Sequence, residues 1–452
     1  MFGMFSFLSF LVKAEIGTVG TTFIINSPDE GRGSGEVHDG ATSNHMFHVG
    51  DYWYKMASEY YTSVSRHRWF WVSTIDTNLT DWSDASSKNI FVLLSYTGSM
   101  WAQYQAVYDE EQGLFHCVWT DQGGDAVVYV QGTPNATGGV TFGSAQNIKT
   151  VTNNANLDIC LMNGKPVITL SGHVGDVGWS TWALFSSDED GTSWTNTYAD
   201  TYGELTFTYC LLQTHAISST HVYVILQEGV GVDNPLYGFY ASTTLNATTS
   251  ITQITTENVE GDSFKSSGDK MTAGYSTVSV NTITPTDYAS LITILYVNTT
   301  KSLKTLFWDV SDESISGDVE VIYTSESAYH PLHPLSAMEN NVIWAGFWNR
   351  TDGDDSNFIL YERDIIGTWG SSTTIDSGKW GTATMIPSTM NKQPYDGKLI
   401  VTHQLTGTDV VYGCDVEAFL PPFDYNFWFV IVGLITFCAI TLYAATIMKG
   451  RR

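Results

Sequence analysis

The sequence predicts an all-β fold built from repeated four-stranded units. Between residues 20 and 420, helical periodicity is almost absent. Short runs rich in Val, Ile, Thr, Tyr and Trp alternate instead with turns of Gly, Asn, Asp and Ser, which is the pattern of short strands and tight connections. One type of strand, rich in aromatic residues and followed by a polar turn, also recurs along the chain. Regular recurrence of this kind indicates a repeat architecture.

The recurring aromatic strand defines the repeat. A pair of strands precedes it, and Asn163-Gly164 and Asp396-Gly397 suit the two-residue turns of such hairpins. A more polar fourth strand follows it, and four antiparallel strands arrayed radially form one blade of a β-propeller. The copies are spaced by roughly 55 residues, within the range of propeller repeats. The aromatic strands lie at residues 69–76, 127–134, 182–190, 237–244, 305–312, 358–364 and 410–416.

We therefore predict a seven-bladed β-propeller over residues 20–420, with a six-bladed ring carrying an added hairpin as the alternative. The seventh unit lacks a fourth strand, whereas residues 20–27 form a strand with no unit of its own. Pairing this N-terminal strand with the last unit would close the ring and remove its exposed edges.

Residues 427–448 predict a C-terminal transmembrane helix. The segment from Phe427 to Met448 contains no charged residue, and a helix needs about 20 apolar residues to span a bilayer. Tyr425 and Trp428 are suited to one interface, and the basic residues of the tail 449–452 follow at the other. The positive-inside tendency then places this tail in the cytoplasm and the propeller outside.

The N-terminal residues 1–14 contain an apolar run of 12 residues, which is too short to span a membrane. Small residues follow it at the place where a signal peptidase cleaves, but no basic residue precedes it. We interpret the segment as a signal peptide, with an uncleaved segment in the membrane interface as the alternative.

Composition narrows the classes of function. The formal net charge is −27, which argues against nucleic-acid binding, because that requires a basic surface. No cysteine pair has zinc-site spacing. The four cysteines ahead of the membrane segment could form disulfides outside the cell. The low density of cysteines in the chain favours buried thiols instead. These four are Cys117, Cys160, Cys210 and Cys414.

Residues 187–194, SDEDGTSW, resemble the Asp-box turn of sialidase-like propellers. The matching residues are Ser187, Glu189, Gly191, Ser193 and Trp194, with Glu189 at the position of the acid. The resemblance implies a structural turn between the third and fourth strands, on the face opposite an active site. It implies no activity, because a sialidase holds the substrate carboxylate with three arginines and this chain offers only Arg66 and Arg68 together in one loop. We therefore predict no catalytic residues.

A ligand would bind on the face that carries the connections between second and third strands and between blades, an expectation from the fold alone. Aromatic rings beside acids and arginines on this face suit stacking on sugars or contact with a protein. The candidate residues are Tyr60, Tyr61, Arg66, Arg68, His173, Asp176, Trp179, Asp233, Tyr329, His330 and Arg350.

Two further kinds of site have weaker signals. Asp352 and Asp354 occupy alternate positions, as the oxygen ligands of a calcium loop do. The remaining ligands and a closing Glu are missing, so no metal or other cofactor is predicted. N-glycosylation sequons also occur in or near the polar turns between strands. They begin at Asn78, Asn135, Asn246, Asn298 and Asn349.

These observations favour a membrane-anchored recognition protein, a cell-surface adhesin or a viral attachment spike, that binds a glycan or a surface protein. One alternative is a membrane-anchored sialidase-like hydrolase or lyase, and another is a structural envelope or surface-layer component. Whether the protein also forms a homo-oligomer stays open.

Overall fold

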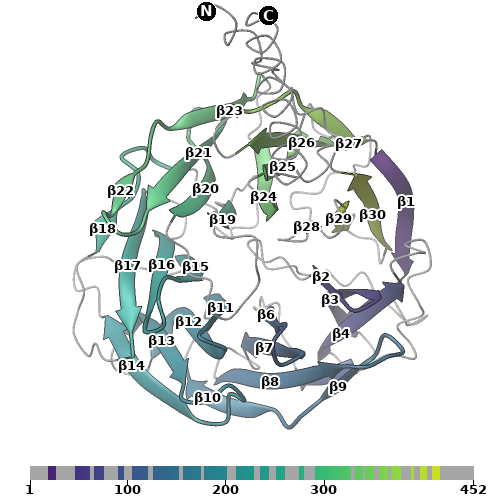
Figure 1. Ribbon diagram of the computed structural model, residues 1–452, viewed down its shortest axis with the longest axis vertical. Helices are drawn as coiled ribbons and strands as arrows, with labels where there is room; N and C mark the ends of the chain where they lie inside the picture. Colours follow the sequence, from purple (N-terminus) through teal and green to yellow (C-terminus); the bar gives the residue numbers. More distant parts are fainter. Residues whose placement is uncertain are drawn as a thin grey trace, which may run out of the picture.

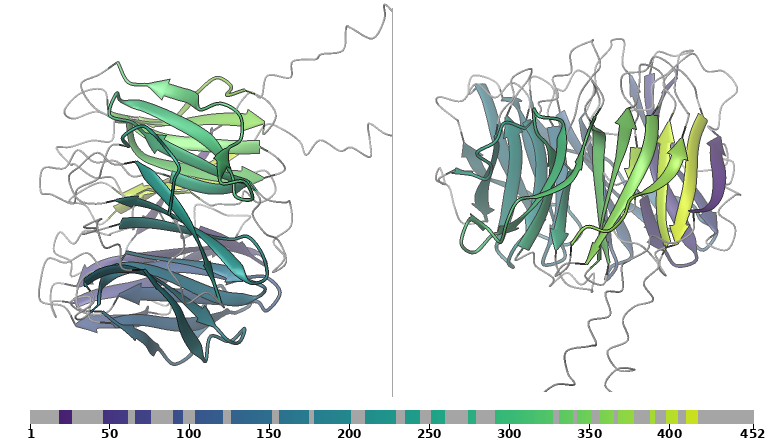
Figure 2. Two further views of the ribbon diagram at one scale, coloured as in Figure 1. Left: turned by 90° about the vertical axis from the view of Figure 1, so that its left-hand side faces the viewer. Right: turned by 90° about the horizontal axis from the view of Figure 1, so that it is seen from above.

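The computed structural model forms a ring of antiparallel sheets around a central axis (Figure 1). Seen edge-on, the strands run from one face of the ring to the other (Figure 2). The residues that the structure describes are 19–26, 46–61, 66–75, 90–95, 104–120, 126–151, 156–174, 178–200, 210–228, 235–243, 251–259, 274–278, 291–326, 331–339, 342–350, 356–364, 368–377, 388–390, 398–404 and 410–417.

Strand pairing divides these residues into seven sheets, which we number as blades in chain order. Blade 1 contains β2 (Met46–Val49), β3 (Tyr52–Tyr61), β4 (Arg66–Ile75) and β5 (Ile90–Ser95). Blade 2 contains β6 (Tyr104–Asp109), β7 (Leu114–Thr120), β8 (Ala126–Pro134), β9 (Val140–Phe142) and β10 (Gln146–Thr150). Blade 3 contains β11 (Asn156–Met162), β12 (Lys165–Val174), β13 (Gly178–Ser186) and β14 (Trp194–Asp200).

The second half of the chain continues the pattern. Blade 4 contains β15 (Cys210–Ala216), β16 (His221–Glu228), β17 (Leu236–Ser242) and β18 (Thr252–Gln253). Blade 5 contains β19 (Gly274–Val278), β20 (Leu291–Val297), β21 (Ser302–Asp309), β22 (Ser314–Ile315) and β23 (Glu320–Thr324). Blade 6 contains β24 (Pro331–Glu339), β25 (Val342–Arg350), β26 (Ser356–Asp364) and β27 (Thr373–Ser377). Blade 7 contains β28 (Ser388–Met390), β29 (Lys398–Gln404), β30 (Val410–Glu417) and the N-terminal strand β1 (Val19–Asn26).

The repeat read from the sequence corresponds to this architecture, and the prediction of an all-β propeller is confirmed. Each of the seven recurring aromatic segments forms the third strand of its own sheet. The ring closes where β1 pairs antiparallel with β30, with Ile24 opposite Tyr412 and Asn26 opposite Val410. This is the pairing expected from the unpaired N-terminal strand, and it gives β30 a neighbour on its outer edge.

Local chemistry explains the tight hairpins. Asn163 and Gly164 connect β11 to β12 with φ angles of 55° and 71°, so both central residues occupy the left-handed region that a type I′ turn requires. The register beside the turn pairs Met162 with Lys165. The other predicted turn, Asp396-Gly397, lies outside the described residues.

The core lies between the blades, because alternate residues of a strand point to opposite faces of a sheet. On β7, Cys117 packs in the cluster shared with Tyr54 of blade 1, whereas Val118 packs in the cluster shared with Leu157 of blade 3. Apolar residues therefore fill both faces of the inner strands, which explains their continuous hydrophobic runs.

The predicted terminal segments, 1–14 and 427–448, lie outside the described residues, as does the tail 449–452. Among the residues that are described, none belongs to a helix long and apolar enough to cross a membrane. The transmembrane helix and the signal peptide therefore stay predictions.

Candidate functional site

Three of the predicted ligand-binding segments lie where a second strand passes to a third. In blade 1, β3 and β4 pair out to their ends, with Tyr61 opposite Arg66 and Tyr60 opposite His67. Arg68 lies opposite Glu59, one step further into the sheet. The backbone thus brings two tyrosines and two arginines together at one end of blade 1.

Blade 3 presents a second segment in the same way. His173 of β12 lies opposite Trp179 of β13, and Val174 lies opposite Gly178. Asp176 belongs to the connection between these strands and lies outside the described residues. An imidazole and an indole therefore occupy paired backbone positions at the end of this hairpin.

Blade 6 provides the third segment. Arg350, the last residue of β25, lies opposite Ser356, the first residue of β26. The weak calcium candidates Asp352 and Asp354 belong to the connection between them, outside the described residues.

These three segments share one face of the ring. All the sheets run in the same order from an inner first strand outward, so every connection from a second to a third strand emerges on the same side. The structure therefore brings Tyr60, Tyr61, Arg66, Arg68, His173, Trp179 and Arg350 to one face, which we call the ligand face. The remaining candidates, Asp233, Tyr329 and His330, lie outside the described residues.

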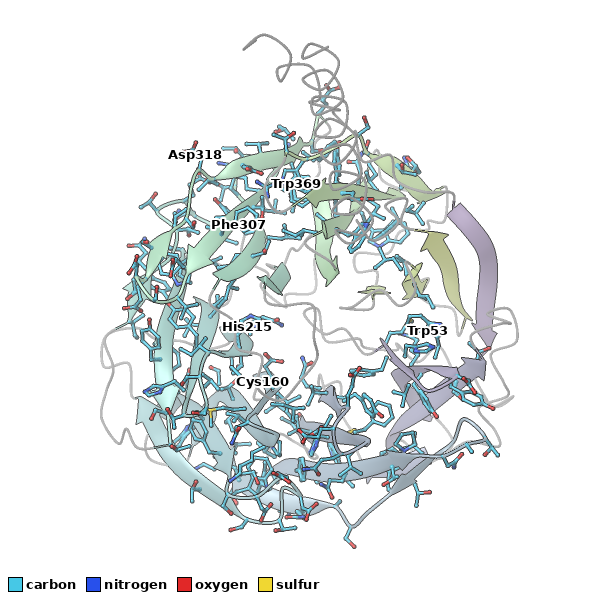
Figure 3. All side chains as sticks on the ribbon, viewed as in Figure 1. Trp53, Cys160, His215, Phe307, Asp318 and Trp369 are labelled. Atoms are coloured by element: carbon cyan, nitrogen blue, oxygen red, sulfur yellow. The ribbon has the colours of Figure 1, made fainter. Side chains whose placement is uncertain are left out.

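Polar contacts between neighbouring blades hold this scaffold, and the sequence analysis did not identify them. Near the axis, the backbone N–H of Thr214 in blade 4 donates to Asp158 Oδ2 of blade 3 at 2.5 Å. The hydroxyls of Thr169 and Thr214 also hydrogen-bond across this boundary. His215 follows Thr214 on β15 and marks this position near the centre of the ring (Figure 3). For comparison, Asp318 of blade 5 lies at the rim of the ring. A carboxylate inside the apolar strand NLDICLM was the available signal, because a buried charge needs a partner.

Arg363 joins blades 5 and 6. Its Nε and Nη2 atoms donate to Glu320 Oε2 and Oε1 at 2.9 and 2.6 Å, a bidentate pair. Its guanidinium carbon also lies 4.6 Å from the centre of the Phe307 ring. Arg363 is thus a structural residue that connects two blades.

The turn that resembles an Asp-box lies between β13 and β14, on the face opposite the ligand face. Gly191 has a φ of 61°, and its carbonyl accepts a hydrogen bond of 2.8 Å from Trp194 Nε1. The N–H of Ser187 donates to the carbonyl of Ser193 at 2.8 Å. This network fixes the path of the chain from the third to the fourth strand.

The acid that holds this turn is Asp188, so the assignment of Glu189 to this position is corrected. Asp188 Oδ1 accepts from the N–H of Thr192 at 2.8 Å, and Oδ2 accepts from the Thr192 hydroxyl. Although burial acts to raise it, these hydrogen bonds hold the pKa of Asp188 below its ordinary value. Glu189 instead accepts a hydrogen bond of 2.8 Å from Gln112 Nε2 of blade 2. The sequence offered three adjacent acids, and only the geometry of the turn distinguishes them.

The described side chains form no metal centre, and Cys117 forms no disulfide. No group of three or more His, Cys, Asp or Glu side chains there could hold a metal ion. The Cys117 thiol is buried without a disulfide, and burial raises its pKa. Cys117 therefore behaves as a small apolar side chain.

Comparison with known proteins gives structural matches of low sequence identity and low TM-score. No protein family model matches the chain, and no curated protein matches it. Among solved structures, a fucose-specific lectin from Aleuria aurantia is 15% identical, with a TM-score of 0.40, covering 71% of this chain and 97% of its own. The polysaccharide lyase Uly1 is 8% identical, with a TM-score of 0.44, covering 90% and 100%. The β-propeller domain of the Trilobed protease from Pyrococcus furiosus is 9% identical, with a TM-score of 0.43, covering 86% and 97%.

Proposed function

We propose that this chain is a recognition protein that binds a glycan or a surface protein through its ligand face. The supporting observation is that blades 1, 3 and 6 each bring candidate binding residues to the connection between second and third strands. Tyrosine and tryptophan rings stack on sugars, and arginines donate paired hydrogen bonds to anionic groups. Contacts between neighbouring blades support these connections.

As part of the same proposal, residues 427–448 anchor the propeller in a membrane and the tail 449–452 is cytoplasmic. The ligand face would then be available to a partner outside the cell or virion. Release of the protein from membranes on deletion of residues 427–452, with the propeller still folded, is the expected result. Retention of the shortened chain on the membrane would contradict this anchor.

A glycan array probed with the full-length protein tests recognition. The informative variant is Arg66→Ala with Arg68→Ala, which removes both cations of the blade 1 segment. We expect binding to fall by about tenfold or more, as for truncated arginines at the centre of an interface. The matched control is Glu189→Ala, which also changes one blade but on the opposite face, and which should leave binding unchanged.

Two results would contradict this proposal, the first in its binding site and the second in its function. Equal binding by the double variant and the control would show that the blade 1 segment does not bind the glycan. Release of shortened sugars during the incubation, abolished by Asp176→Asn or Asp233→Asn, would establish the alternative of a glycan-processing enzyme.

A further inference from the structure

The same hydrogen-bonded asparagine turn occurs twice, at Asn135-Ala-Thr137 and at Asn298-Thr-Thr300. In the first, Asn135 Oδ1 accepts from the N–H and hydroxyl of Thr137 at 3.0 and 2.8 Å, and from the N–H of Gly139 at 3.0 Å. In the second, Asn298 Oδ1 accepts from the N–H and hydroxyl of Thr300 at 3.1 and 2.8 Å, and from the N–H of Ser302 at 3.0 Å. The two sequons therefore share one local geometry.

Their surroundings differ at the amide nitrogen. Asn298 is 5% exposed, and its Nδ2 donates to Glu257 Oε2 at 3.3 Å. Glu257 also accepts from Lys304 Nζ at 2.6 and 2.7 Å, so the Asn298 amide belongs to a network between blades 4 and 5. A substituent on this nitrogen would have to displace the Glu257 carboxylate.

Asn135 and Thr137 are both exposed. Within the described part of the chain, the Asn135 amide nitrogen donates no hydrogen bond, while its oxygen is fully used by the turn. The turn is also fixed to blade 1, because the Ser73 hydroxyl donates to the carbonyl of Gly138 at 2.6 Å. Asn135 therefore presents an accessible amide nitrogen on an ordered support.

We propose that Asn135 is an acceptor for an N-linked glycan and that Asn298, in the same sequon geometry, is a structural residue that stays unmodified in the folded protein. In the transfer, a lipid-linked diphosphate oligosaccharide would be the donor. A bond forms between Asn135 Nδ2 and the anomeric carbon, the bond from that carbon to the diphosphate breaks, and Nδ2 loses one proton. This inference is independent of what the ligand face binds.

The position of Asn135 decides which face of the ring its glycan would cover. It directly follows β8, the third strand of blade 2, so a glycan there would project from the face opposite the ligand face. The sequons at Asn78 and Asn246 likewise follow third strands in the sequence, after β4 and β17, although they lie outside the described residues. Glycosylation at Asn135 would therefore leave the ligand face accessible.

The test expresses the full chain in the secretory pathway of a eukaryotic host and maps the purified, folded protein by peptide mass spectrometry. Enzymatic release of N-glycans converts an occupied Asn to Asp, which identifies each site separately. We expect conversion at Asn135 and none at Asn298. Thr137→Ala should abolish the Asn135 glycan, and Thr137→Ser should restore it because the hydroxyl is retained.

Thr300→Ala is the matched control, because it changes the same position of the turn that contains the buried Asn298. It should leave the glycan map unchanged and lower the denaturation midpoint, since Asn298 loses one donor. A secreted reporter glycoprotein from the same cells verifies that the host transferase acts. An unmodified Asn135 beside a glycosylated reporter, or a glycan on Asn298 in the folded protein, would overturn the proposal.

Discussion

Two buried tyrosines show how neighbouring blades can be joined in opposite ways. Tyr129 of blade 2 and Tyr223 of blade 4 are both fully buried, and each ring lies against a glycine. A Cβ atom added to Gly191 would lie 2.4 Å from Tyr129 Oη, and one added to Gly238 would lie 2.3 Å from Tyr223 Oη. Gly191 belongs to the next blade, whereas Gly238 belongs to the same blade as its tyrosine.

The hydroxyl partners show the reverse arrangement. Tyr129 Oη hydrogen-bonds His116 Nδ1 of its own blade at 2.6 Å. Tyr223 Oη accepts from Trp308 Nε1 at 3.0 Å and donates to Glu313 Oε1 at 3.4 Å, both in blade 5. Tyr129 thus joins blades 2 and 3 by packing across the boundary, whereas Tyr223 joins blades 4 and 5 by hydrogen bonds across it. A buried tyrosine needs both kinds of contact, and either can come from the neighbouring blade.

Gly191→Ala should produce the largest effect. The substitution places a Cβ at a φ of 61° and against the Tyr129 ring, so backbone strain adds to overpacking. We expect a loss of about 3 kcal/mol in the free energy of unfolding, measured by chemical denaturation with tryptophan fluorescence.

Two further alanine variants separate these contributions. In Gly238→Ala, the added Cβ would lie against the Tyr223 ring, but the backbone φ is not positive. Overpacking alone should therefore lower the free energy of unfolding by about 2 kcal/mol. Gly317→Ala has a φ of 85° with nothing within 4 Å, and should cost about 1 kcal/mol from strain. If Gly191→Ala were no worse than Gly317→Ala, packing across the junction of blades 2 and 3 would not be important.

The same junction should also respond to pH through His116. Burial lowers the pKa of His116 from 6.5 to about 4, so the unfolded chain binds the proton more tightly. Stability therefore rises with pH between about 4 and about 6.5. Over that window the gain should approach about 2 to 3 kcal/mol, at about 1.4 kcal/mol for each pKa unit.

A second buried group opposes this trend. Desolvation raises the pKa of Glu362 in blade 6 from 4.5 to about 7, so its contribution to stability falls as pH rises through that range. Denaturation midpoints should be measured across this pH range. In His116→Gln, the increase of stability with pH that His116 causes should disappear. In Glu362→Gln, the decrease of stability with pH that Glu362 causes should disappear. A wild-type pH profile retained in His116→Gln would show that this histidine does not titrate on unfolding.

The fold was largely predictable from sequence, because repeated strands and turns are local signals. The aromatic third strands, the Asn163-Gly164 turn and the closing strand β1 all follow from residue pattern and from the need to cover edges. The positions of Tyr61, Arg66 and Trp179 at hairpin ends followed as well, since a repeat fixes which connections share a face.

Contacts between blades were not predictable, because they join residues distant in the sequence. Nothing local indicates that Arg363 pairs with Glu320, or that Glu257 buries the amide of Asn298 while Asn135 stays exposed. Asp188 was missed for a different reason. Its neighbours carry the same charge, and only the direction of each side chain in the turn decides which one accepts the Thr192 hydrogen bonds.

Removing each tyrosine hydroxyl should have smaller effects than Gly191→Ala and would test the comparison most directly. Tyr223→Phe removes the hydrogen bonds to both Trp308 and Glu313 of blade 5, which should cost about 2 kcal/mol, whereas Tyr129→Phe removes the hydrogen bond to His116 within blade 2 and should cost about 1 kcal/mol. Hydrogen exchange should locate the difference, with faster exchange on β21 of blade 5 in Tyr223→Phe and no change on β13 of blade 3 in Tyr129→Phe. Equal costs with faster exchange on β13 would mean that the Tyr129 hydroxyl also supports the neighbouring blade, and the two junctions would no longer differ in kind.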